Sequence, residues 1–154
     1  MKRSREEKYP DTKYFHYYNA NPKNRITGDC RIRAICTALE IPYNDVVMEL
    51  AQIQCETGYD QTTTQGLALL LKRHGWTKLK QPRNKDNTKM SAKQFVDKLF
   101  HPIYEEELGL PEFYIDRIVC NLGSHHMACI ITGQVYDIWN SSNETIGNIW
   151  VRRD

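Results

Sequence analysis

Apolar residues in the first two-thirds of the chain recur at the three- and four-residue spacing that is typical of amphipathic helices. The first such segment follows Thr27-Gly28-Asp29-Cys30, and Ile32, Ile35, Cys36 and Leu39 form its apolar stripe. Capping residues or a terminal glycine bound three more such segments. These predicted helices run from a cap at Asn44 or Asp45 to about Gln54, from Gly66 to His74, and from a cap at Ser91 through Phe95, Val96 and Leu99.

From Tyr114 onwards the pattern changes to short runs rich in β-branched and aromatic residues, which is typical of strands. Turn residues separate these runs, and Thr132-Gly133-Gln134 is predicted to be a compact hairpin turn. The predicted strands are Tyr114–Cys120, His126–Thr132, Val135–Trp139 and Ile146–Val151. Helices followed by an antiparallel sheet indicate an α+β domain.

The chain is predicted to form one domain. Residues 1–13 are dense in charge and lack apolar periodicity, so they are interpreted as a flexible N-terminal tail or a surface strap. Residues 14–154 are assigned to a single domain that begins with the aromatic-rich extended segment 14–18. A chain of 154 residues can bury about two-thirds of its unfolded surface.

Composition narrows the classes of partner and compartment. The formal net charge of +2 gives no electrostatic basis for binding nucleic acid or an anionic membrane. The five cysteines are odd in number and lack disulfide-framework spacing, which favours a reducing compartment. No apolar run approaches the roughly 20 residues that span a bilayer, and the N-terminus lacks the apolar segment of a signal peptide. A cytoplasmic protein is therefore expected.

Cys30 is the best nucleophile candidate in the sequence. It is predicted to lie in the first turn of a helix, where unpaired N–H groups and a dipole of roughly half a positive charge favour a thiolate. Asp29 has the residue type that caps a helix, and Gly28 allows a sharp turn before it. Cys30 lies off the apolar stripe, so it is expected to face a cleft. Arg31 and Arg33 are expected to be solvated, to pair with an acidic neighbour or to help hold the thiolate, and Arg33, one helical turn away, is the better candidate for the last role.

The predicted hairpin offers partners for this cysteine. A three-residue turn at Thr132-Gly133-Gln134 would place Ile131 opposite Val135. Counting outward from this pair places His126 opposite Asn140. Cross-strand neighbours have Cβ atoms about 5 Å apart, so the Asn140 amide oxygen can accept the imidazole N–H and fix its tautomer. A base oriented in this way is the general form of a nucleophile-activating relay.

Two alternatives remain open within this hairpin. A two-residue turn would shift the register by one residue and favour His125, because neighbours on a strand point to opposite faces. His126 is preferred because such a slip would also reverse the whole apolar set. Asp137 is the alternative to Asn140 as the orienting group. It is predicted to lie mid-strand near Cys129 and is interpreted as a structural group.

Two segments carry a resemblance to a known family. Gly28-Asp29-Cys30-Arg31-Ile32-Arg33-Ala34 and Tyr136-Asp137-Ile138-Trp139-Asn140 resemble the "GDCxxRA" and "YDxWN" segments of small phage and bacterial papain-like cysteine peptidases. The resemblance covers residues 21–39 and 113–150. It implies a papain-like fold, in which an N-terminal catalytic helix packs on a C-terminal antiparallel sheet. By this resemblance Cys30 is the nucleophile, His126 the base and Asn140 the orienting group.

The resemblance implies a cysteine peptidase, amidase or isopeptidase that acts on a protein or peptide through an acyl-enzyme, without a cofactor. Hydrolysis and acyl transfer share this half-reaction. A phage-encoded member would be expected to act on a host protein in the host cytoplasm. Papain-like enzymes place a side-chain amide, usually Gln, before the cysteine to hold the oxyanion, and here Asn24 and Asn21 are the candidates.

Two other kinds of function are weighed against the hydrolase. A catalytically inactive papain-like module would use the same cleft to bind a protein or peptide partner. A zinc site would need ligands such as Cys120, His125 or His126, and Cys129, but there is no CxxC pair, so no metal is expected. The cysteines other than Cys30 lie in apolar stretches and are interpreted as small core residues.

Overall fold

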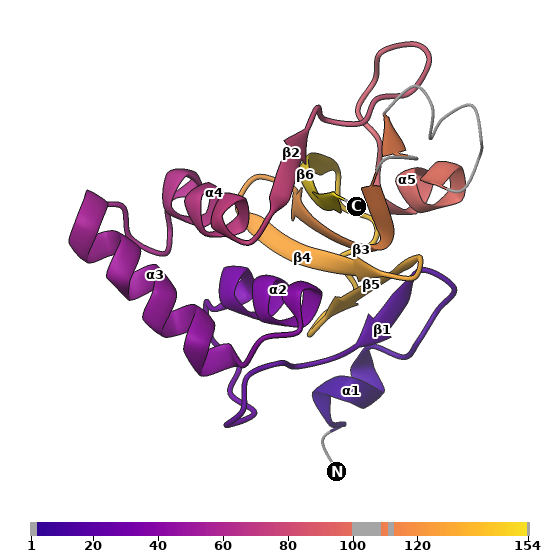
Figure 1. The fold of residues 1–154 in the computed structure, drawn as a ribbon. Coiled ribbons are helices and arrows are strands. Elements are labelled where there is room, and N and C mark those ends of the chain that lie inside the picture. The colour runs from indigo at the N-terminus through magenta and orange to yellow at the C-terminus, as the bar shows by residue number, and fades with distance from the viewer. Residues whose placement is uncertain (1–2, 100–108, 111–112, 154) are drawn as a thin grey trace.

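A six-stranded sheet with helices on both faces forms the protein (Figure 1). The computed structural model describes residues 3–99, 109–110 and 113–153. The helices in these ranges are α1 (Arg5–Lys8), α2 (Cys30–Leu39), α3 (Tyr43–Thr57), α4 (Thr64–Arg73) and α5 (Ala92–Leu99). The strands are β1 (Phe15–Tyr17), β2 (Trp76–Leu79), β3 (Phe113–Leu122), β4 (His126–Ile131), β5 (Gln134–Asp137) and β6 (Ile146–Arg153).

The strand order in the sheet is β1-β5-β4-β3-β6-β2. β1 pairs with β5 in parallel, and every other neighbouring pair is antiparallel. The predicted α+β class is confirmed, and the four predicted strands correspond to β3, β4, β5 and β6. The strand β2 was not predicted. It is short and carries two exposed polar residues, so its local pattern is weak, and pairing with β6 defines it.

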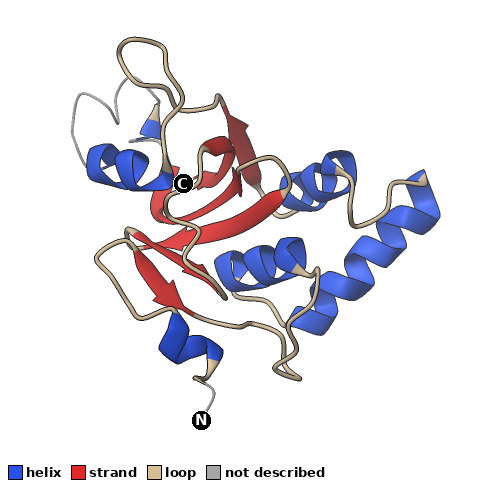
Figure 2. Cartoon of the chain, turned by 180° about the vertical axis from the view of Figure 1, so that it is seen from behind, coloured by secondary structure: helices blue, strands red, loops and turns tan. Residues whose placement is uncertain are grey.

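The sheet separates two apolar cores. Helices α2, α3 and α4 cover one face, and α5 covers the other (Figures 1 and 2). Side chains along β4 alternate between the two cores: Met127 and Cys129 belong to the first, Ala128 and Ile130 to the second. This alternation is the consequence of the two-residue period of a strand buried on both faces. α2 therefore packs directly on the middle of the sheet.

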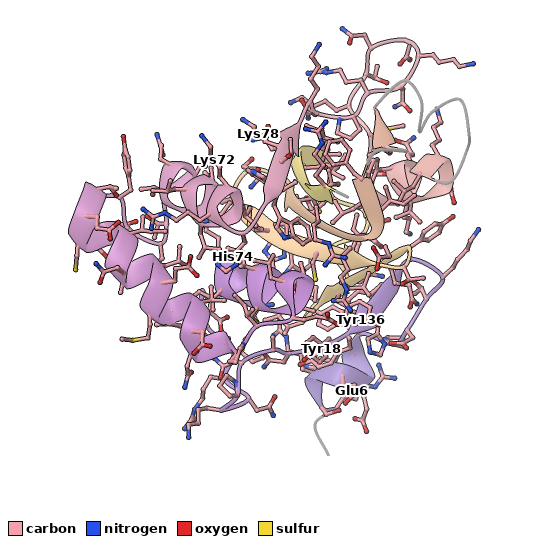
Figure 3. All side chains as sticks on the ribbon, in the orientation of Figure 1. Glu6, Tyr18, Lys72, His74, Lys78 and Tyr136 are labelled. Atoms are coloured by element: carbon pink, nitrogen blue, oxygen red, sulfur yellow. The ribbon has the colours of Figure 1, made fainter. Side chains whose placement is uncertain are left out.

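Charged and aromatic side chains join the outer elements (Figure 3). His74, which follows α4, contacts Glu49 of α3 through Nε2 at 2.8 Å. The rings of Tyr18 and Tyr136 lie 5.8 Å apart, beside the parallel pair β1 and β5. No helix among the described residues is both long enough and apolar enough to span a membrane.

The N-terminal segment contains a short helix that contacts the rest of the domain. Ser4 and Glu7 form a reciprocal capping box at the start of α1. Nε of Arg5 donates a hydrogen bond of 2.6 Å to the carbonyl oxygen of Ile138, at the end of β5. A four-residue helix has too little periodicity to be predicted, and its contact with residue 138 joins distant parts of the chain. The segment is a strap on the domain surface.

Candidate active site

The local sequence around Cys30 builds a helix start, as predicted. α2 begins at Cys30, and the side chain of this cysteine is half-buried. The stripe that includes Ile32 and Ile35 is buried against the sheet, which leaves Cys30 at the end of the helix. Asp29, however, does not cap the helix with its side chain. Its carboxylate instead accepts hydrogen bonds from Arg33, Tyr43 and Asn21.

The hairpin between β4 and β5 has a two-residue turn, so the predicted three-residue turn is wrong. Ile131 lies opposite Gln134, and Ile130 lies opposite Val135. The two turn residues, Thr132 and Gly133, have φ values of 47° and 82°. Two successive positive φ values match the strand twist in a tight hairpin. A β-branched threonine rarely adopts positive φ, so this turn type could not be predicted from its residues.

This register brings His126 and Asp137 together. His126 begins β4 and Asp137 ends β5, beyond Cys129 and Tyr136, the last residues that pair in this ladder. At this open end of the hairpin both side chains contact α2, although Ile130 and Val135 belong to the core under α5. Nε2 of His126 lies 2.5 Å from Oδ2 of Asp137. Sequence reasoning had linked the two-residue turn to His125, which is exposed.

The other side of the His126 ring meets Cys30. Cys30 and His126 are close enough for each to shift the pKa of the other, the thiol downwards and the imidazole upwards. Since Nε2 is held by Asp137, Nδ1 is the ring nitrogen left for the sulfur. The ring of Trp139 packs on His126 with centroids 4.9 Å apart and shields one side of it. Three side chains from α2, β4 and β5 thus lie in series, with His126 between the thiol and the carboxylate.

The electrostatics of this chain favour a thiolate–imidazolium pair. Burial by itself raises the pKa of Cys30, but hydrogen bonds from His126 and the Met127 backbone, with the charges of His126 and Arg31, bring it below its ordinary value. Burial lowers the pKa of His126, yet its bonds to Asp137 and Cys30 outweigh this and raise the pKa to about 9. With a pKa of about 9, His126 is protonated near neutral pH, and the lowered pKa of Cys30 favours its thiolate.

Asp137 is held in place on all sides. Its side chain is 1% exposed, and burial alone would raise its pKa, but its hydrogen bonds keep the pKa below the usual value. Oδ2 accepts from Ser141 at 2.6 Å as well as from His126. Oδ1 accepts from the backbone of Ile138 at 2.8 Å and from Nη1 of Arg33 at 3.1 Å. A carboxylate with these donors stays ionised and cannot rotate freely.

A buried ion network lies behind the reactive residues. Nε of Arg33 donates to Oδ1 of Asp29 at 2.7 Å, while its Nη1 reaches Asp137. Oδ2 of Asp29 accepts from Tyr43 at 2.7 Å and from the Asn21 amide at 2.9 Å. Burial raises the pKa of Asp29, but these bonds lower it overall. Arg33 was the preferred candidate for a charge that helps to hold the Cys30 thiolate. In the structure Arg33 is bound by two carboxylates, and Arg31 is the arginine whose charge acts on Cys30.

Asn140 hydrogen-bonds Ser142, whereas Asp137 is the residue that bonds to His126. Its Oδ1 accepts from the backbone and the hydroxyl of Ser142, at 3.2 Å and 2.5 Å. Asp137, weighed in the sequence as the alternative, takes the orienting position that had been predicted for Asn140. With one residue fewer in the turn than predicted, the register no longer places Asn140 opposite His126.

The two predicted oxyanion residues have different surroundings. The Asn21 amide nitrogen donates to Asp29, so it belongs to the buried network. Asn24 is exposed, has a φ of 53°, and accepts a hydrogen bond of 3.3 Å from the Asn19 amide. Within the described residues, neither side chain hydrogen-bonds Cys30, and a role of either in holding an oxyanion stays a prediction.

The other cysteines do not share the site. Cys36, Cys120 and Cys129 are buried, but Cys55 is exposed, so its interpretation as a core residue is wrong. Cys120 and Cys129 face opposite cores of the sheet. The residues that the structure describes include no group of three or more histidine, cysteine, aspartate or glutamate side chains arranged to hold a metal ion.

The Arg33 network predicts a large effect on stability. Arg33→Met is expected to lower the free energy of unfolding by about 3–5 kcal/mol, because two buried carboxylates would lose their cation. Arg33→Lys keeps the charge without the planar fork and should lose less. Urea unfolding followed by circular dichroism measures both.

The matched control for that measurement is Arg73→Met. Arg73 and Glu56 form an ion pair of 3.0 Å in which each side chain is 43% exposed. Its loss is expected to change the free energy of unfolding by less than about 1 kcal/mol. Equal losses for the Arg33 and Arg73 variants would contradict the importance of the buried network.

Comparisons with known proteins return no relatives for this chain: no protein-family model, no curated protein and no solved structure matches it. The functional interpretation therefore rests on the geometry of Cys30, His126 and Asp137.

Proposed function

We propose that this protein is a cysteine hydrolase that cleaves an amide or isopeptide bond of a polypeptide, with Cys30 as nucleophile, His126 as base and acid, and Asp137 as the orienting carboxylate. The observation that carries the proposal is the series of Cys30, His126 and the buried Asp137, in which His126 lowers the pKa of the thiol and hydrogen-bonds the carboxylate. A nucleophile, a base and an orienting group in this order are the parts of a covalent acyl-transfer mechanism.

The arrangement supports a papain-like interpretation of the fold. The cysteine begins a helix that packs on a largely antiparallel sheet, and the histidine begins a strand of that sheet. Asp137 occupies the position for which the family resemblance implied Asn140. A carboxylate fixes the imidazole tautomer as an amide does, and it also stabilises the imidazolium by its charge.

The proposed reaction begins from the thiolate–imidazolium pair. The Cys30 thiolate attacks the carbonyl carbon, forming the C–S bond and moving the carbonyl π electrons onto oxygen. Backbone N–H groups at the start of α2, Cys30 among them, have no partner within the helix and can donate to the developing oxyanion. His126 then gives its proton to the leaving nitrogen as the C–N bond breaks. Water or an amine, deprotonated by His126, attacks the thioester and releases Cys30.

The proposal predicts an unusually acidic, reactive thiol at position 30. In a Cys55→Ser background, the remaining cysteines besides Cys30 are buried. Alkylation of Cys30 by iodoacetamide, followed by mass spectrometry, should show an inflection well below the ordinary range of about 8.5. Mixing with p-nitrophenyl acetate should give a burst of nitrophenolate and an acetyl group on Cys30.

Cys30→Ser is the control for both measurements and should abolish the burst and the labelling at this position. Slow alkylation with the profile of an ordinary thiol, together with no burst, would overturn the hydrolase proposal. That result would favour the inactive papain-like module, in which the same residues only shape a binding cleft.

A further inference from the structure

A polar cleft of about 330 Å³ adjoins the reactive pair. Arg31 and His125, which line it, are the chain neighbours of Cys30 and His126, and Thr64 lines it from the start of α4. Ligand pockets range from roughly 300 to 1,000 Å³, so this cleft has the size for a side chain and the backbone next to it. Its position makes it part of the surface that a substrate of Cys30 would contact.

The lining of the cleft is rich in hydrogen-bond donors and carries one cationic group, Arg31, beside the titratable His125. The amides of Asn121 and Asn148 also line it, and within the described residues no side-chain hydrogen bond occupies either amide. None of the residues that line this cleft is an aspartate or a glutamate. The chemistry of the cleft is therefore complementary to an anion.

The Arg31 guanidinium is available for such a ligand. Among the described residues, no carboxylate lies within ion-pair distance of Arg31, whereas Arg33 on the same helix is held by two. Asp60 is the acid that Arg31 influences from a distance, and its Oδ1 already accepts from the backbone and hydroxyl of Thr62. Arginine binds a carboxylate through two parallel N–H donors, which gives both strength and orientation.

The cleft continues into a second one of about 420 Å³, whose lining includes both Lys89 and Glu144. Gly123, Ser124 and Gly147 line both, so the two form one groove over the turn between β3 and β4 and the start of β6. A Cβ atom at Gly147 would lie 3.2 Å from the Cβ atom of Asn121, so the absence of a side chain there keeps this stretch open. A polar groove made of two adjoining clefts has room for an extended polypeptide.

We infer that the substrate is an extended polypeptide with an aspartate or glutamate side chain close to the scissile carbonyl, and that Arg31 binds this carboxylate in the cleft. The inference rests on the proposed function, because it takes Cys30 as the nucleophile beside the cleft. Arg31 then determines specificity, while Arg33, two residues along the helix, positions Asp137.

The test uses two reagents that share one electrophile and differ by a carboxylate, maleimidopropionic acid and N-ethylmaleimide. Their second-order rate constants with Cys30 are measured in the Cys55→Ser background. The ratio of the two constants is independent of the fraction of thiolate, because the same thiolate reacts with both. Arg31→Gln is expected to lower the ratio of the acid to the neutral reagent about ten-fold.

Lys72→Gln is the matched control, because it removes one positive charge from the far end of α4 (Figure 3). It should leave the ratio within about two-fold of wild type. An unchanged ratio in Arg31→Gln would overturn the inference, even if Cys30 reacts rapidly. Slow reaction of Cys30 with both reagents would instead count against the proposed function, and the effect of Arg31→Gln on the ratio would still report whether the cleft binds a carboxylate.

Discussion

Replacing His126 by alanine is expected to slow the alkylation of Cys30 at about pH 6 by about a hundred-fold. Burial raises the pKa of Cys30, and the interaction with His126 is the main effect that lowers it. Without His126 the thiol of the half-buried Cys30 would be almost entirely protonated at this pH. The rate constant with iodoacetamide, measured as a function of pH, is the readout.

The same pKa values fix the sign of the pH dependence. Because the pKa of His126 is raised from 6.5 to about 9, its protonation stabilises the fold fully below the lower value and this contribution is lost as pH rises through the upper one. The difference in unfolding free energy between wild type and His126→Ala should therefore shrink as pH rises towards about 9.

His125→Ala is the matched control for both measurements, since His125 is the exposed neighbour of His126. It is expected to leave the acid side of the labelling profile unchanged within about two-fold. If Cys30 lost its low-pH reactivity in His125→Ala and kept it in His126→Ala, the base would be His125 and not His126.

Replacing Asp137 by asparagine is expected to have two large effects. The unfolding free energy should fall by about 3–5 kcal/mol, because the buried Arg33 would keep only Asp29 as its counter-charge. Alkylation of Cys30 at about pH 6 should slow by at least about ten-fold, because the carboxylate that raises the pKa of His126 is removed. Labelling is measured under conditions where circular dichroism shows the variant to be folded.

Two further variants make this measurement decisive. Asn140→Ala should change the labelling rate by less than about two-fold and the stability by about 1 kcal/mol, since its described bonds go to Ser142. Asp137→Asn combined with Arg33→Met removes both members of a buried pair and should recover part of the lost stability. A labelling defect in Asn140→Ala larger than that in Asp137→Asn would show that Asn140 orients His126 in solution.

The roles of Arg31 and Arg33 follow from their places on one helix. Arg33 lies on the buried side of α2 and is 6% exposed, whereas Arg31 is half-buried at the edge of the cleft. An arginine paired with two carboxylates supports the site, and an arginine beside a cleft without acids can contact a substrate. The loss of stability in Arg33→Met therefore measures how far Arg33 holds the site together. The change in reagent selectivity in Arg31→Gln measures how far Arg31 binds a substrate carboxylate.

Local sequence patterns determined most of the elements of this fold. The helix that starts at Cys30, the three later helices and the strands β3 to β6 follow from apolar spacing, capping residues and β-branched runs, which act within a few residues of each other. The same local reasoning placed Cys30 at a helix start and His126 at a strand start. These features depend on short-range sterics and hydrogen bonding, and the sequence contains that information directly.

Only the tertiary structure decided which side chain meets the imidazole. That choice depends on one residue in a turn, because the two-residue period of strands turns a shift of one position into a change of face. Thr132 adopts positive φ only because the paired strands on either side require it. The pairing of Arg33 with Asp137, 104 residues apart, and the release of Arg31 to the cleft likewise follow from the packing of α2 on the sheet, which no local pattern encodes.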